Sequence, residues 1–176
     1  VDFSYVGSSA DLLILCGVQP LVAQEENSFE LLNDTTIYFD ELTFNSDLEK
    51  EKFESIYFDK DTDYFSLFFV SKKGANTAKV ESSKKLMQAQ INLFKSKNKD
   101  EKKLIKWIYK EVHDELFKKY ELENHFDDVF EKGYYNYLSS TAIYSMILEE
   151  LEIPYQINIL PNHVNLTAYP NTHKIL

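Results

Sequence analysis

His163 and the start of a predicted helix near Asn136 are the two features of this sequence that could together perform chemistry. The first turn of a helix has unpaired N–H groups and a partial positive charge, which lower the pKa of a cysteine placed there. A histidine on a facing strand can act as the base for that thiol, and a carboxylate on the next strand can orient the histidine. This layout is that of a thiol enzyme that transfers acyl groups.

Three predicted elements position these two features. Apolar residues at helical spacing predict a helix over residues 136–151, which must end before Pro154. Alternating polar and apolar residues then predict two strands, over residues 155–160 and 163–169, joined by a tight turn. His163 falls at the head of the second strand, on its more polar side.

The order of these features is similar to that of a known family. Residues 133–154 read GYYNYLSSTAIYSMILEELEIP, and residues 162–170 read NHVNLTAYP. A glycine before a patterned helix, then Ile-Pro, a strand and His-Val, resembles the transglutaminase-like superfamily of thiol enzymes, which also has an upstream helix like the one predicted over residues 99–120. The resemblance covers roughly residues 99–176. It implies an α+β fold, with helices packed on an antiparallel sheet and a papain-like core that is incomplete at the C-terminus.

The chain departs from the pattern of this family at three places. Counted back from Pro154, the position of the family's cysteine is Tyr137, whose phenol is a poor nucleophile for acyl transfer. Glu152 replaces the usual glycine before Ile-Pro, and the family's acid would follow His163 beyond Leu176. The resemblance therefore implies a catalytically inactive binding or scaffolding module, with His163 as a vestigial base, that binds a peptide or protein in its former cleft.

Two alternatives stay open. The chain can be a truncated or mutated copy of an active thiol hydrolase or acyltransferase that acts on peptide or amide substrates. It can also be a plain structural domain, in which Tyr137 is an ordinary aromatic residue at a helix start and His163 an ordinary strand-end histidine. Ser139 and Ser140 are better explained as polar residues of the first helical turn than as substitute nucleophiles.

No metal site and no cofactor is predicted. The sequence contains four histidines, and no pair of them has the spacing of metal ligands. Residues 59–70 begin like a calcium-binding loop, but Tyr64 stands where the loop needs glycine and Val70 where it needs glutamate. This segment is predicted to start as a solvated turn.

The rest of the chain is predicted to add helices and short strands. Helices are predicted over residues 47–58, 77–94 and 99–120, and Asn98 is expected to cap the last of them. Residues 36–39 are predicted to form a strand, residues 64–70 a buried strand or core segment, and residues 127–133 a connector.

Composition limits the classes of partner. The chain has 176 residues, of which 44% are hydrophobic, and this is enough for one domain with a core. Its net charge is −10 and all of its basic residues are lysine, so we expect no nucleic-acid partner. The apolar run at residues 12–22 is too short to span a bilayer, so no stable membrane span is expected.

Three segments are predicted along the chain. Residues 1–24, which include the single cysteine Cys16, are read as signal-peptide-like or disordered, with a strand or buried apolar segment as the other interpretation. Residues 25–98 are predicted to be an N-terminal extension of helices and strands, and residues 99–176 the partial transglutaminase-like core. The localisation stays open between export and the cytoplasm.

Overall fold

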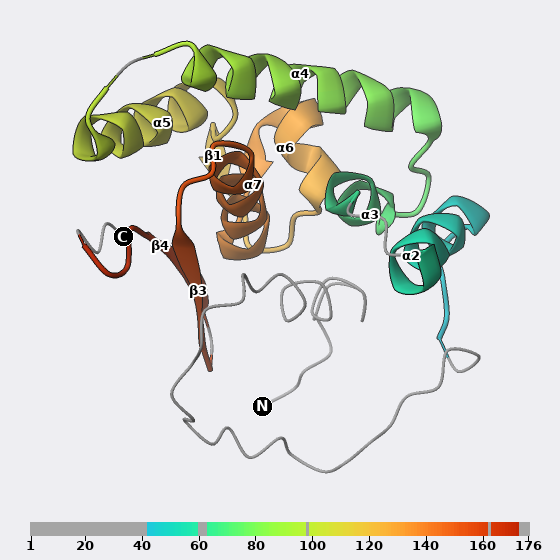
Figure 1. Cartoon of the computed structure of the whole chain (residues 1–176). Coiled ribbons are helices and arrows are strands. Elements are labelled where there is room, and N and C mark those ends of the chain that lie inside the picture. Colours follow the sequence, from blue (N-terminus) through green and yellow to red (C-terminus); the bar gives the residue numbers. More distant parts are fainter. Residues whose placement is uncertain (1–41, 60–62, 98, 162, 173–176) are drawn as a thin grey trace.

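The computed structural model describes residues 42–59, 63–97, 99–161 and 163–172. Over these residues the protein has an α+β fold, with six helices and two sheets of two strands each (Figure 1). The elements are α2 (Asp47–Asp59), α3 (Tyr64–Val70), α4 (Thr77–Lys95), α5 (Glu101–Glu115), β1 (Lys119–Tyr120), α6 (Phe126–Lys132), β2 (Tyr134–Tyr135), α7 (Tyr137–Glu150), β3 (Tyr155–Leu160) and β4 (His163–Ala168). The predicted α+β class is therefore confirmed.

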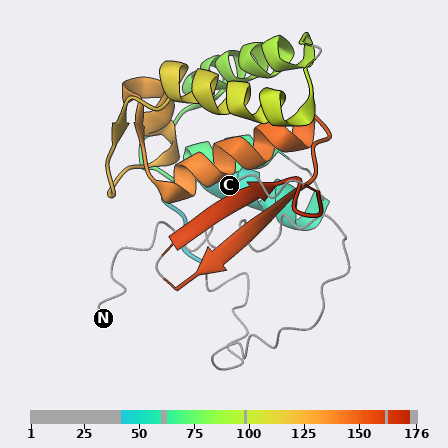
Figure 2. The same ribbon diagram turned by 90° about the vertical axis from the view of Figure 1, so that its left-hand side faces the viewer.

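Helix α7 lies at the centre of the molecule. Figure 2 shows α4 and α5 side by side on one side of it and the β3–β4 hairpin on the other. Ile143 and Ile147 of α7 are 0% exposed. Sequence pattern predicted one buried face for this helix, but its position between two layers buries it on several sides.

All six helices and both strands of the hairpin contribute to one hydrophobic core. On α4 the core side chains recur at helical spacing, as predicted, with Val80, Met87, Ile91 and Phe94 buried. Phe53 of α2 belongs to the same core. The described part of the predicted N-terminal extension therefore packs together with the C-terminal elements.

Strands β3 and β4 form the predicted antiparallel hairpin. Leu160 pairs with His163 at its tip, and Tyr155 pairs with Ala168 at its base. Tyr155 and Ala168 are buried against the helices, whereas His163 is exposed. Thr141 of α7 donates a hydrogen bond to a backbone carbonyl of β4, at 3.5 Å. This contact fixes β4 along α7.

Residues 64–70 form helix α3, so the strand interpretation was wrong, whereas the alternative of a buried core segment is confirmed. The Asp63 carboxylate accepts a hydrogen bond of 3.2 Å from the Ser66 amide, which caps the first turn. Phe69 and Val70 are 0% exposed. A short run that is apolar throughout fits a buried helix as well as a strand, and here the cap and the surrounding helices decide.

The predicted end of the helix over residues 99–120 was also wrong, because α5 runs from Glu101 to Glu115. The chain then turns, and β1 pairs in parallel with β2. This pairing needs Gly133, which has a φ of +73° and whose added Cβ would lie 2.5 Å from Cγ of Lys118. The N-cap of α5 is Asp100, which accepts a bond from Lys103, and Asn98 lies outside the described residues.

Residues 127–133, predicted as a connector, belong largely to helix α6. Its first turn is closed by the Asp128 carboxylate, which accepts a hydrogen bond of 3.2 Å from the His125 amide. The predicted strand at residues 36–39, residues 1–24 and most of the predicted turn after Asp59 lie outside the described residues. Within the described ranges, no helix combines the length and apolar character needed to cross a bilayer.

Candidate functional site

The start of α7 is held by a reciprocal cap. Asn136 is 5% exposed, and its side-chain oxygen accepts hydrogen bonds from the amides of Leu138 and Ser139 at 3.0 and 2.9 Å. In return, the Ser139 hydroxyl accepts a bond of 2.9 Å from the Asn136 amide. The side-chain nitrogen of Asn136 donates to the Leu122 carbonyl at 3.0 Å. One asparagine therefore fixes both the helix start and the loop before α6.

Tyr137 is the first residue of α7, and it lies against His163, the first residue of β4. Their ring centroids are 5.4 Å apart and the ring planes are tilted by 56°. The tyrosine is half-buried and the histidine is exposed. The two residues singled out from the sequence are thus brought together by the packing of β4 on α7.

The pair is an aromatic contact without a catalytic hydrogen bond. Within the described residues, no hydrogen bond joins the phenol of Tyr137 to the imidazole of His163, and no carboxylate forms an ion pair with that imidazole. A phenol attacks an acyl group far less readily than a thiolate. The arrangement can hold a base beside a helix start, but it offers no nucleophile for acyl transfer.

A pocket of about 190 Å³ adjoins Tyr137. It is lined by the start of α7, by the loop that leads into α6, and by Phe68 of α3. Phe68 and Phe126 in its wall are buried, whereas Leu122 is 62% exposed. Because Phe68 is far in sequence from the other lining residues, no spacing pattern could have predicted this pocket.

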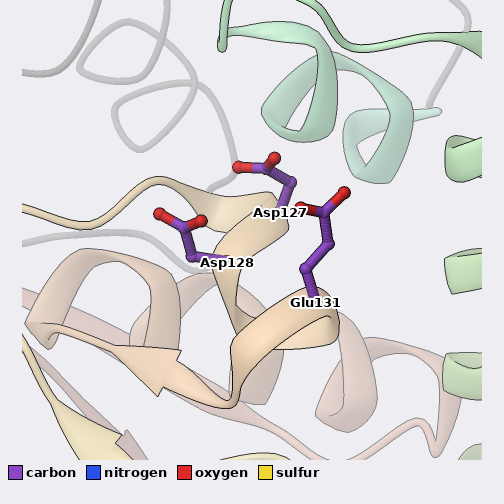
Figure 3. A group of neighbouring side chains, drawn as sticks. All are labelled: Asp127, Asp128 and Glu131. Atoms are coloured by element: carbon purple, nitrogen blue, oxygen red, sulfur yellow. The ribbon is translucent and has the colours of Figure 1, made fainter.

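Three carboxylates on α6 form a second group of polar side chains. Ligand atoms of Asp127, Asp128 and Glu131 lie within 4.8 Å of one another, and Figure 3 shows these side chains together on the helix. Sequence reasoning missed this cluster because it read the segment as a connector. The spacing Asp-Asp-x-x-Glu would have indicated it once a helix was assumed.

Lysines neutralise these carboxylates. Lys72 Nζ lies 3.1 Å from Asp127 and 2.8 Å from Asp128, and Lys132 lies 2.8 Å from Asp128. Lys79 pairs with Glu131. The ammonium group of Lys72 therefore occupies the position between two carboxylates where a cation would bind, and the cluster is explained by ion pairs and by the capping of α6.

The pKa values of the two aspartates shift in opposite directions. Burial raises the pKa of Asp127, although its hydrogen bond from Lys72 opposes that shift. Burial would also raise the pKa of Asp128, but hydrogen bonds from Lys132 and Lys72 lower that pKa from 3.8 to about 2. Asp128 is thus the more strongly stabilised anion of the two.

The remaining candidates from the sequence have structural roles. Ser139 belongs to the cap of α7, and Ser140 donates to the Tyr137 carbonyl at 3.3 Å, as expected for residues of a first turn. His113 lies far along α5, where its Nδ1 is 3.0 Å from the Tyr144 hydroxyl. Burial raises the pKa of that tyrosine, which keeps its phenol neutral.

Comparison with protein-family models, with curated proteins and with solved structures finds no match to this chain. Its function must therefore be inferred from its own residues and their geometry.

Proposed function

We propose that this chain is a transglutaminase-like domain without catalytic competence that serves as a peptide-binding or scaffolding module. The observation that carries the proposal is the contact between Tyr137 and His163, whose ring centroids are 5.4 Å apart. These residues stand at the nucleophile and base positions that the family resemblance assigns. They are 26 residues apart in sequence (163 − 137), so their contact is a property of the fold.

The placement of the two residues supports this reading. Tyr137 follows the N-cap of α7, where the helix field favours a negative charge on a nucleophile. His163 opens β4, the strand that packs along the same helix. A helix packed on an antiparallel hairpin also agrees with a papain-like core, which we propose as the finer description of the fold.

The loss of catalysis follows from the residue at position 137. A neutral phenol at a helix start cannot replace a thiolate in acyl transfer. Its ring fills the space beside His163 that a smaller thiol would leave open to a substrate. What remains is the adjoining pocket of about 190 Å³, and we propose that the former cleft now binds a peptide there without chemistry.

Restoring the thiol tests this proposal. In a Cys16→Ser background, which removes the single native cysteine, Tyr137→Cys places one thiol at the start of α7. Leu86→Cys, at a residue 55% exposed in the middle of α4, is the matched control. We expect iodoacetamide at pH 7 to modify the thiol at position 137 about fivefold faster or more, because the helix start lowers its pKa.

Equal rates for the two thiols would contradict the proposal. The same Tyr137→Cys variant also examines the alternative of a mutated copy of an active hydrolase or acyltransferase. Such a copy should regain turnover of p-nitrophenyl acetate in addition to a reactive thiol. A reactive thiol without turnover is the result that we expect.

A further inference from the structure

The pocket beside Tyr137 has features that restrict its occupant. It is the proposed peptide site, and Tyr137, which contacts His163, is one of its lining residues. We propose that this pocket binds one apolar side chain, of leucine or phenylalanine size, from an extended peptide that also carries lysine or arginine. The inference rests on the proposed function and names the class of its partner.

The size of the pocket favours a single side chain. Its volume is about 190 Å³. Pockets that enclose whole drug-sized molecules have volumes of roughly 300–1,000 Å³. A pocket below that range fits one anchoring residue of a peptide whose backbone stays outside.

Part of the pocket wall is apolar and well packed. The rings of Phe68 and Phe126 are 6% and 5% exposed and pack against each other, with centroids 5.5 Å apart. Leu122, on the loop before α6, is 62% exposed, although it lines this pocket. A side chain entering the pocket would remove apolar surface of Leu122 from water, which stabilises the complex.

Two amides at the helix start beside the pocket are not available to bind an anion. The amides of Leu138 and Ser139, which a negatively charged group could use at a helix start, already donate to the side chain of Asn136. Glu123 lines the pocket and is exposed, and no described lysine forms an ion pair with it. The net charge of the chain is −10. Charge complementarity therefore selects basic residues beside the apolar anchor.

The loop that forms the rim is held in place before any ligand binds. Asn124 donates through its side-chain nitrogen to the Tyr134 carbonyl at 2.8 Å, and Asn136 donates to the Leu122 carbonyl at 3.0 Å. A rim fixed in this way reduces the entropy that a ligand must lose on binding. Weak, short peptides are consequently sufficient as probes.

The test is an NMR titration of the full ¹⁵N-labelled chain with three peptides. The probes are acetyl-Lys-Leu-Lys-amide, acetyl-Lys-Ala-Lys-amide and acetyl-Glu-Leu-Glu-amide. We expect the first to shift the amide signals of Leu138, Ser139 and residues 122–126. The alanine peptide should bind about tenfold more weakly or worse, because it lacks three carbons that the pocket would bury. The acidic peptide should also bind more weakly, and 1 M salt should reduce that difference.

A pair of variants locates the effect. Leu122→Asp should weaken binding of the leucine peptide about tenfold, because it places a charge on the rim. Leu86→Asp, at another exposed leucine, should leave binding unchanged. Equal affinity of the leucine and alanine peptides for the unaltered chain would overturn the inference, and so would shifts confined to residues outside the pocket. Both results are obtained with the unaltered chain, so they do not depend on whether a variant folds.

Failure of this inference and failure of the proposed function give different results. A reactive thiol in Tyr137→Cys together with equal peptide affinities removes only the claim about the apolar anchor. Selective binding of the leucine peptide with an unreactive thiol keeps the peptide pocket and removes the descent from a thiol enzyme.

Discussion

Two groups of polar side chains lie on either side of the short segment that joins α6 to α7. The carboxylates of Asp127, Asp128 and Glu131 resemble a cation site, and the Tyr137–His163 pair resembles the remains of a catalytic site. They differ in what surrounds them. Each carboxylate of the first group has a lysine partner, whereas the second group adjoins a pocket and has no charged partner among the described residues.

This difference distinguishes a cluster of side chains that has a structural role from one that could bind a ligand. Buried charges that form ion pairs can hold elements together, and here Lys72, from the turn after α3, ties that turn to α6. A pair of rings that contact each other beside a pocket leaves polar atoms available to a ligand. Residue types alone would have favoured the acidic cluster as the site, and its lysine partners reverse that choice.

The largest effect is expected from breaking the lysine link. Lys72→Met leaves Asp127, which is 4% exposed, without its cation and should lower the free energy of unfolding by about 2–3 kcal/mol at pH 7. Lys79→Met is the control, because its pair with Glu131 is more exposed and should matter by less than about 1 kcal/mol. Urea unfolding measures both values. Similar losses of unfolding free energy in Lys72→Met and Lys79→Met would mean that burial of an ion pair does not determine its contribution to stability.

Acid should weaken the same region. The pKa of Asp128 is about 2 in the folded chain and near 3.8 without its partners, so its stabilising effect is present above pH 4 and is lost as the pH falls towards 2. The loss should be on the order of 2 kcal/mol, and Asp128→Asn should remove this part of the slope. The raised pKa of Asp127 acts in the opposite direction, since protonation favours its folded form. Unfolding curves recorded between pH 5 and pH 2 measure this pH dependence. If Asp128→Asn leaves the slope of stability against pH unchanged, the result would count against the ion-pair network.

The cap of α7 holds the helix start that carries Tyr137, in the second of the two groups. Asn136→Ala removes the acceptor for two helix amides and the donor to the Leu122 carbonyl, and it should cost about 1–2 kcal/mol of stability. Asn136→Asp keeps the acceptor and loses only the donor, so its cost should be smaller. Thermal unfolding gives both shifts. A loss in Asn136→Asp as large as that in Asn136→Ala would show that the tie to the loop outweighs the cap.

The smallest effect is expected from divalent cations. Calcium or manganese added to the unaltered chain should change Tm by less than about 1 °C, because Lys72 already neutralises Asp127 and Asp128. In Lys72→Met the two carboxylates lose this ammonium, and calcium should then stabilise the variant. Strong stabilisation of the unaltered chain by calcium would show that the acidic cluster binds metal. That result would contradict its interpretation as a set of structural ion pairs.

The elements around the candidate site were largely predictable from local patterns. Helix α7, its start near Asn136 and its end before Pro154, and the hairpin with His163 at the head of β4 follow from periodicity and from the constraint that proline imposes. The same patterns failed for α3, where every residue of a short segment is apolar or small, so that neither period is visible.

Other features depend on contacts between distant segments. The pairing of Lys72 with Asp127 joins the turn after α3 to helix α6, and the pocket joins Phe68 to the loop at Leu122. The early end of α5 results from β1–β2 pairing, which requires the close approach of Gly133. Such contacts leave no periodic signal in the sequence, because they are set by tertiary packing.

The central claim is that the start of α7 and His163 retain the arrangement of a thiol site. The most direct measurement is the pH dependence of iodoacetamide modification in Cys16→Ser, Tyr137→Cys, with and without His163→Ala. We expect the thiol to titrate below its usual pKa of about 8.5, and His163→Ala to raise that pKa by about one unit. A thiol that titrates at or above about 8.5 and does not respond to His163→Ala would contradict the account.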